Sequence, residues 1–343
     1  MPAEVEHAPL PPKRKVKWYL FILILLGFAI YFFFSRFVAM ERAALAVSSL
    51  KIPFVMLAFV AQAISYLGSG YLLRKTVPVA DKPVSVVDGA LMTAGANSVG
   101  TLGGGVIGTA GMVYFWLRRR GINPGVAGLG GWLPIVLNNT VLALTSLAGL
   151  LIMVYLGKSP HIFAAGFGLA VLVLGTFLGI LIWTVTHREH LEPLATAIAN
   201  FVGKFRHRSS DASKIKTAVN HLLEGWDTLL QDGWSGPATG ALLTTGFDML
   251  TLAFLFLAAG YRINAAVLIA GYGVPQLLGK LTVILGGVGV VEGGMIGLFS
   301  LLGVPRGSAV LVVLAYRLVS FWLPTAVGIL LIPYLGRKTA SPA

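Results

Sequence analysis

The stretch Leu102-Gly-Gly-Gly-Val-Ile-Gly-Thr-Ala-Gly-Met112 lies inside a longer apolar run, Val84–Leu117. That run is too long for one comfortable membrane span, and Gly103, Gly104 and Gly105 lie near its middle. Consecutive glycines break a helix because they lose the most backbone entropy on ordering. A half of about 15 residues would reach only about 22 Å, less than the hydrocarbon core of about 30 Å. We therefore predict two half-helices that form a re-entrant hairpin.

A second run, Ala265–Leu302, repeats this pattern around Leu285-Gly-Gly-Val-Gly-Val-Val-Glu-Gly-Gly-Met295. Its glycine cluster consists of Gly286, Gly287 and Gly289. Further along, Gly121–Ala127 aligns with Gly303–Ala309, and the register differs by only one residue from that of the glycine clusters. The chain is therefore predicted to contain an internal repeat, with a hairpin in each copy.

The composition is that of an all-α polytopic membrane protein. The chain has 343 residues, of which 56% are hydrophobic and 11% charged, whereas soluble domains carry about 25% charged residues. This excludes a soluble enzyme and a disordered chain, and the absence of cysteine excludes disulfides and thiolate metal sites. The net charge of +13 comes from short clusters between apolar runs, which are typical of membrane topology. We expect no nucleic-acid partner, no metal and no cofactor.

Six more apolar runs are predicted to be full spans: Trp18–Phe34, Ile52–Leu73, Val126–Leu156, Ile162–Thr186, Gly236–Ala259 and Gly307–Leu335. If both glycine-broken runs are re-entrant hairpins, 18 Lys and Arg residues lie on the cytoplasmic side and 6 on the outside. If both runs cross the membrane as ordinary spans, the numbers are 11 and 13. Lys280 and Arg317 lie within the apolar runs and are not counted. The positive-inside rule favours the first arrangement. We therefore predict a multi-pass protein of the bacterial cytoplasmic (inner) membrane with both termini in the cytoplasm.

The domain organisation follows from this topology. Residues 1–343 form a single membrane domain with repeat 1 at 52–156, a cytoplasmic amphipathic connector at 187–235 and repeat 2 at 236–335. The connector is predicted to be structural, with a regulatory role as the alternative. The repeats enter the membrane in opposite senses, and inverted repeats with glycine-interrupted segments indicate a transporter with its site near the midplane.

Charged residues inside the apolar runs are the first candidates for this site, because a charge at the bilayer centre costs about 2.5–3.5 kcal/mol. They are Asp248, Lys280, Glu292 and Arg317. In one interpretation, Glu292 and Arg317 form a purely structural pair. In the other, Arg317 and Lys280 attract an anionic headgroup while Glu292 gates the site or binds a proton.

Other candidates are polar groups of repeat 1 and the glycines of both clusters. Backbone N–H groups at the glycine clusters are predicted to bind phosphate, as helix N-termini do. In the repeat alignment Asn97 faces Lys280, and Asn138 lies in the span that follows the first hairpin. Asp248 and Asp88 are predicted to carry a coupling proton, unless either lies at a membrane interface.

The segment Leu285-Gly-Gly-Val-Gly-Val-Val-Glu-Gly-Gly-Met-Ile-Gly-Leu298, followed by Ala315-Tyr-Arg-Leu-Val-Ser-Phe-Trp-Leu-Pro324, resembles the lysylphosphatidylglycerol synthase transmembrane (flippase-like) family. The resemblance extends from Trp18 to Leu335. It implies translocation of a phospholipid or other polar lipid, with Glu292 and Arg317 at the matching positions. Two-domain members carry a soluble aminoacyl transferase after this region, and the sequence ends at Ala343. We therefore expect a stand-alone member that is not an enzyme.

The leading interpretation is a flippase that moves a polar, anionic lipid through a midplane cavity between the repeats. One alternative is a non-transporting membrane subunit that anchors or regulates a lipid-modifying enzyme through the connector. Another is a membrane-embedded transferase acting on lipid carriers, which the absence of an acidic metal-binding cluster disfavours. Glycine-rich helix faces also leave a homodimer open.

Overall fold

The computed structural model describes residues 50–77, 83–155, 157, 233–281 and 285–338, with isolated residues between 168 and 227. Every regular element in these parts of the chain is helical. The helices are α2 (Ile52–Thr76), α3 (Val86–Val99), η1 (Gly100–Gly104), α4 (Gly105–Arg119), α5 (Pro124–Tyr155), α9 (Ser235–Ala258), α10 (Ala265–Leu281), η3 (Leu285–Gly287), α11 (Val290–Leu301), α12 (Arg306–Arg317), η4 (Leu318–Trp322) and α13 (Leu323–Lys338).

Four helical stretches within the described residues are long and apolar enough to cross a membrane. They are Ile52–Thr76, Pro124–Tyr155, Ser235–Ala258 and Arg306–Gly336, the last of which joins α12, η4 and α13. The chain is therefore a helical, multi-pass membrane protein. Two predicted spans, Trp18–Phe34 and Ile162–Thr186, lie outside the described residues apart from isolated positions, as does most of the connector 187–235.

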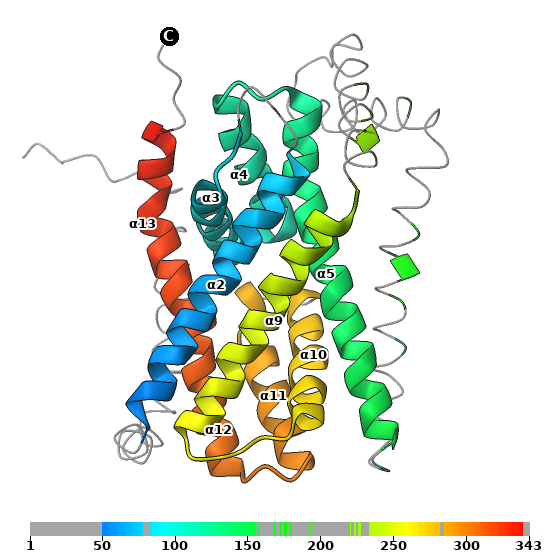
Figure 1. Ribbon diagram of the computed structural model, residues 1–343, viewed down its shortest axis with the longest axis vertical. Helices are drawn as coiled ribbons and strands as arrows, with labels where there is room; N and C mark the ends of the chain where they lie inside the picture. The colour runs from blue at the N-terminus through cyan, green and yellow to red at the C-terminus, as the bar shows by residue number, and fades with distance from the viewer. Residues whose placement is uncertain are drawn as a thin grey trace, which may run out of the picture. The chain divides into compact units, whose positions relative to one another are not determined.

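Two pairs of shorter helices form hairpins at the glycine clusters. Helices α3 and α4 pack against each other and are joined through η1, where Gly103 has a φ of 125°. Helices α10 and α11 pack in the same way after a break at η3, where Gly286 has a φ of 59°. The predicted helix breaks are confirmed at both clusters. In Figure 1, α3 and α4 lie in the upper half of the view and α10 and α11 in the lower half.

The connection after each hairpin has the same local backbone structure. Gly121 and Gly303 both end a helix in the left-handed region, with φ values of 75° and 92°. The backbone N–H of the residue after each glycine donates to the carbonyl five residues earlier. Ile122 donates to the Leu117 carbonyl at 3.2 Å, and Val304 donates to the Phe299 carbonyl at 2.9 Å. These equivalent bonds lie where the sequence alignment puts Gly121 opposite Gly303.

The long helices of each half of the chain pack on helices of the other half. Helix α2 packs along α9, while α5 packs on α10 and α13 packs on α3. Small residues allow close approach: a Cβ at Gly149 would lie 2.7 Å from the Cα of Ala270. In the contact between α3 and α13, the Ser98 hydroxyl of α3 donates to the Thr325 carbonyl of α13 at 3.0 Å. Each hairpin is therefore held by the last long helix of the other half.

Trp226 is a described residue of the predicted connector. Its buried ring packs with Leu129 and Leu133 of α5, and it meets the Trp234 ring edge to face at a centroid distance of 5.3 Å. The end of the connector is thereby anchored to the helix that follows the first hairpin.

Candidate functional site

The tips of the two hairpins meet, because η1 contacts η3. Gly286 lies at this meeting point and has no room for a side chain. A Cβ there would contact the Phe321 ring and would lie 3.3 Å from the Thr101 Cγ2 of the first tip. Glycine is thus required both by the positive φ and by the close approach.

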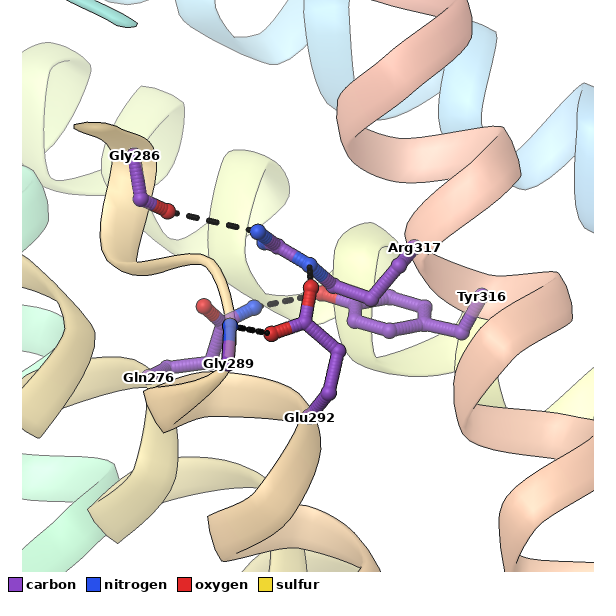
Figure 2. Close-up of polar contacts among 6 residues, drawn as sticks. All are labelled: Gln276, Gly286, Gly289, Glu292, Tyr316 and Arg317. Carbon is purple, nitrogen blue, oxygen red and sulfur yellow. Dashed lines mark hydrogen bonds and ion pairs between the residues drawn. The ribbon is translucent and has the colours of Figure 1, made fainter. Parts of the chain in front are cut away.

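A buried ion pair lies directly beside this junction (Figure 2). The Arg317 Nε donates to Glu292 Oε1 at 2.7 Å, and Arg317 is only 4% exposed. Glu292 occupies the first turn of α11, and its Oε2 accepts the Gly289 N–H at 2.6 Å. A carboxylate is stable at this position because the free N–H groups of a helix N-terminus favour negative charge.

Arg317 makes two further contacts. Its Nη2 donates to the Gly286 carbonyl at 3.2 Å, and its guanidinium lies over the Phe321 ring at 3.9 Å from the centroid, a favourable cation–π distance. Helix α12 ends at Arg317, and the π-helical turn η4 begins at the next residue. Glu292 therefore neutralises the Arg317 charge in this conformation, and the pair joins α11 to α12.

A second polar cluster surrounds Asp248 of α9. Its Oδ2 accepts the hydroxyl of Tyr272 at 2.7 Å and that of Tyr316 at 2.6 Å. The Tyr316 oxygen in turn accepts the Gln276 amide at 2.5 Å, a bond visible in Figure 2. Because Tyr316 directly precedes Arg317, the two clusters share helix α12.

Several predicted residues lie at the same junction. Lys280 is exposed near the end of α10 and interacts electrostatically with Asp248 and Arg317. Asn97 is exposed one turn before the first tip, and its carbonyl accepts the Thr101 hydroxyl at 2.9 Å. The other tip positions are the exposed glycines Gly103, Gly104 and Gly105 and the positive-φ glycine Gly287.

The remaining predicted residues have other surroundings. Asp88 forms an ion pair with Arg120 at 3.0 Å, joining the start of α3 to the end of α4 rather than the tips. Asn138 lies in α5, and its buried Oδ1 has no hydrogen-bond partner among the described residues. One of the expected phosphate donors, the Gly289 N–H, donates to Glu292 in this conformation, and the phosphate site stays a prediction.

Sequence reasoning missed the partners of Asp248. Tyr316 stands in the Ala315–Pro324 segment quoted above, and Tyr272 and Gln276 lie on one face of α10. The available signal was Asp248 itself, because a carboxylate within an apolar helix requires hydrogen-bond donors on neighbouring helices. Within the described residues, no group of three or more His, Cys, Asp or Glu could hold a metal ion.

The family model for the lysylphosphatidylglycerol synthase TM region matches residues 20–328, which include both hairpins and both polar clusters. The chain belongs to this family. Among its relatives is a UPF0104 membrane protein of Methanocaldococcus jannaschii, 27% identical over 168 residues, which are 46% of this chain and 48% of the relative. One of Pyrococcus horikoshii is 36% identical over 87 residues, 25% of this chain and 26% of the relative.

A UPF0104 membrane protein of Methanothermobacter thermautotrophicus is 35% identical over 88 residues, which are 26% of each chain. The matched segments thus span half or less of the length of these curated relatives. All three relatives are archaeal, so the bacterial inner membrane stays a prediction. The match to the lysylphosphatidylglycerol synthase TM region family extends over most of the chain and establishes a membrane protein.

Proposed function

We propose that the chain is a lipid transporter that moves a polar lipid with an anionic headgroup between leaflets. The observation that carries this proposal is the buried Arg317–Glu292 pair, placed at a helix break where two hairpin tips meet. A buried guanidinium beside a broken helix is costly in a membrane protein and is therefore a candidate for substrate binding.

The proposed membrane arrangement is six spans and two re-entrant hairpins in an inverted repeat, with both termini in the cytoplasm. Each hairpin helix has 17 residues or fewer, below the roughly 20 needed to cross a bilayer. The equivalent connections at Gly121 and Gly303 and the exchanged packing of α5 and α13 support the repeat. Two re-entrant hairpins from opposite faces would bring their tips together, as η1 and η3 do.

Ligand exchange at Arg317 explains how a headgroup could be held without leaving a bare charge. A phosphate can accept the guanidinium hydrogen bonds that a carboxylate accepts. When the headgroup replaces Glu292, Arg317 stays neutralised, and Glu292 keeps its bond to the Gly289 N–H. The acyl chains remain in the bilayer, against the apolar side chains that the helices expose.

The test uses proteoliposomes with fluorescent anionic and zwitterionic phospholipids. A membrane-impermeant reductant bleaches the outer leaflet, and the accessibility of the inner pool is followed over time. We expect the wild-type protein to accelerate lipid movement and Arg317→Ala and Glu292→Gln to lower the rate at least tenfold.

The chain offers a matched control for Arg317→Ala. Arg119 is exposed, donates to the Gly336 carbonyl at 2.8 Å and lies 5.3 Å from the Phe115 ring centroid. Arg119→Ala therefore removes the same charge and similar contacts outside the junction, and we expect it to retain transport. Equal losses in both variants would contradict a specific role for Arg317. No acceleration by the wild-type protein for any lipid would favour the non-transporting subunit instead.

A further inference from the structure

We propose that Asp248 is a proton-binding site whose occupancy drives lipid movement at Arg317. This inference rests on the proposed transport function and adds its energy source. The geometry that supports it is the arrangement of hydrogen-bonding groups around the carboxylate and its direct connection, through Tyr316, to the lipid-binding arginine.

The neighbours of Asp248 are mostly neutral groups. Helix α2 contributes Tyr66, helix α10 contributes Tyr272 and Lys280, and helix α12 contributes Tyr316. Helix α5 carries no acidic or basic residue. The two ion pairs given above for the described residues use Asp88 and Glu292, not Asp248. A carboxylate held by phenol groups can change its charge without breaking an ion pair.

Gln62 of α2 completes the arrangement. It is 6% exposed, and its side chain lies beside the Asp248 carboxylate. Its buried Oε1, however, has no partner among the described residues, which is costly for a polar atom. A protonated Asp248 could donate to this oxygen after rotation of the amide. Gln62 can therefore donate to the ionised carboxylate and accept from the protonated one.

A proton fits this site better than a metal cation does. Asp248 Oδ2 is the acceptor for two hydroxyl donors, so the phenol hydrogens point at the carboxylate. A sodium or calcium ion binds oxygen lone pairs and would have to displace these hydrogens. A proton can be added to the other oxygen while both phenol bonds remain in place.

The site is connected to lipid binding through one helix. A hydroxyl bonds about twice as strongly to an ionised carboxylate as to a neutral one, so protonation of Asp248 weakens the hold on Tyr316. The next residue is Arg317, and the π-helical turn Leu318–Trp322 follows; such turns are frequent at functional sites. Loosening Tyr316 thereby alters the position of the guanidinium relative to Glu292.

The first measurement is the steady-state lipid distribution in proteoliposomes with a gradient of one pH unit and the membrane potential clamped at zero. With one proton moved per lipid, wild-type protein should give about tenfold asymmetry of a labelled lipid. Asp248→Asn should abolish the asymmetry and Asp248→Glu should restore it. Asp88→Asn removes a carboxylate that is ion-paired with Arg120, and we expect it to keep the response.

The second measurement is independent of transport. Infrared difference spectra between acidic and alkaline pH should show the carbonyl band of a protonated carboxyl group, absent in Asp248→Asn and present in Asp88→Asn. Lipid asymmetry under the pH gradient that persists in Asp248→Asn would overturn the inference. A carbonyl band that is unchanged in Asp248→Asn would overturn it as well. Lipid asymmetry produced by a sodium gradient at fixed pH would show that sodium, and not a proton, is the coupling ion. Failure of the wild-type protein to move any lipid, with the band present, would refute the transport function and leave the proton site standing.

Discussion

The ion pair between Arg317 and Glu292 can be tested by a double-mutant cycle with Glu292→Gln, Arg317→Gln and the double variant. Removing one partner of a buried pair costs about 3–5 kcal/mol because the other charge is left uncompensated. The lower end applies to Glu292→Gln, since Arg317 keeps the Gly286 carbonyl and the Phe321 ring. In the double variant no charge remains, so we expect a total cost of about 3 kcal/mol rather than about 6.

The coupling energy is therefore predicted to be about 3 kcal/mol. It is measured as the free energy of unfolding of the detergent-solubilised protein in a titration with denaturing detergent. Additivity of the two single changes to within about 0.5 kcal/mol would refute the reasoning, because uncoupled residues behave in that way.

The same double variant separates a structural pair from a lipid-binding pair. If Arg317 and Glu292 only join hairpin to span, transport should follow stability, so the double variant should move lipid at least as well as the single variants. If Arg317 binds the headgroup, the double variant should be as stable as the single variants or more so and should still fail to move lipid. The proteoliposome assay described above distinguishes the two results.

Three further predictions concern the hairpins and their neighbours. Gly286→Ala should cost about 2–4 kcal/mol in thermal unfolding, because it combines a strained positive φ with a clash; an unchanged melting temperature would contradict the tip geometry. The hydroxyls of Ser69 and Thr244 lie 3.3 Å apart, so a cysteine at each position should form a disulfide in this cysteine-free chain, seen as altered gel mobility; no cross-link under oxidation would argue against the crossing of α2 and α9. The re-entrant arrangement predicts that a cysteine at exposed Arg119 is labelled from the cytoplasm and one at exposed Arg306 from outside, and labelling of both from one side would refute it.

The helix breaks could be predicted from sequence because glycine acts locally. Three adjacent glycines at 103–105, and the cluster around Gly286, weaken a helix wherever it lies in the fold. The candidate pair could be predicted for a similar reason, since a charge such as Glu292 or Arg317 within an apolar run needs a partner.

The surroundings of Asp248 could not be predicted in the same way. Its hydroxyl donors, Tyr272 and Tyr316, come from two other helices, and tyrosine in an apolar helix is equally common at membrane interfaces. Only the three-dimensional packing brings these groups together. Likewise, Asp88 and Asp248 look alike in sequence, yet Asp88 has Arg120 beside it and Asp248 has phenols.

The exchange of long helices between the two halves has a consequence for biogenesis. Ser98 of the first hairpin bonds to Thr325, which is synthesised 227 residues later. At about 5–20 residues per second, the hairpin waits roughly 11–45 seconds for α13. During that interval its glycine-rich tip needs shelter from lipid, because unsatisfied backbone groups are costly there. Insertion machinery must therefore hold the first half of the chain until the last helix arrives, so defects in α13 should surface as early degradation of the nascent protein.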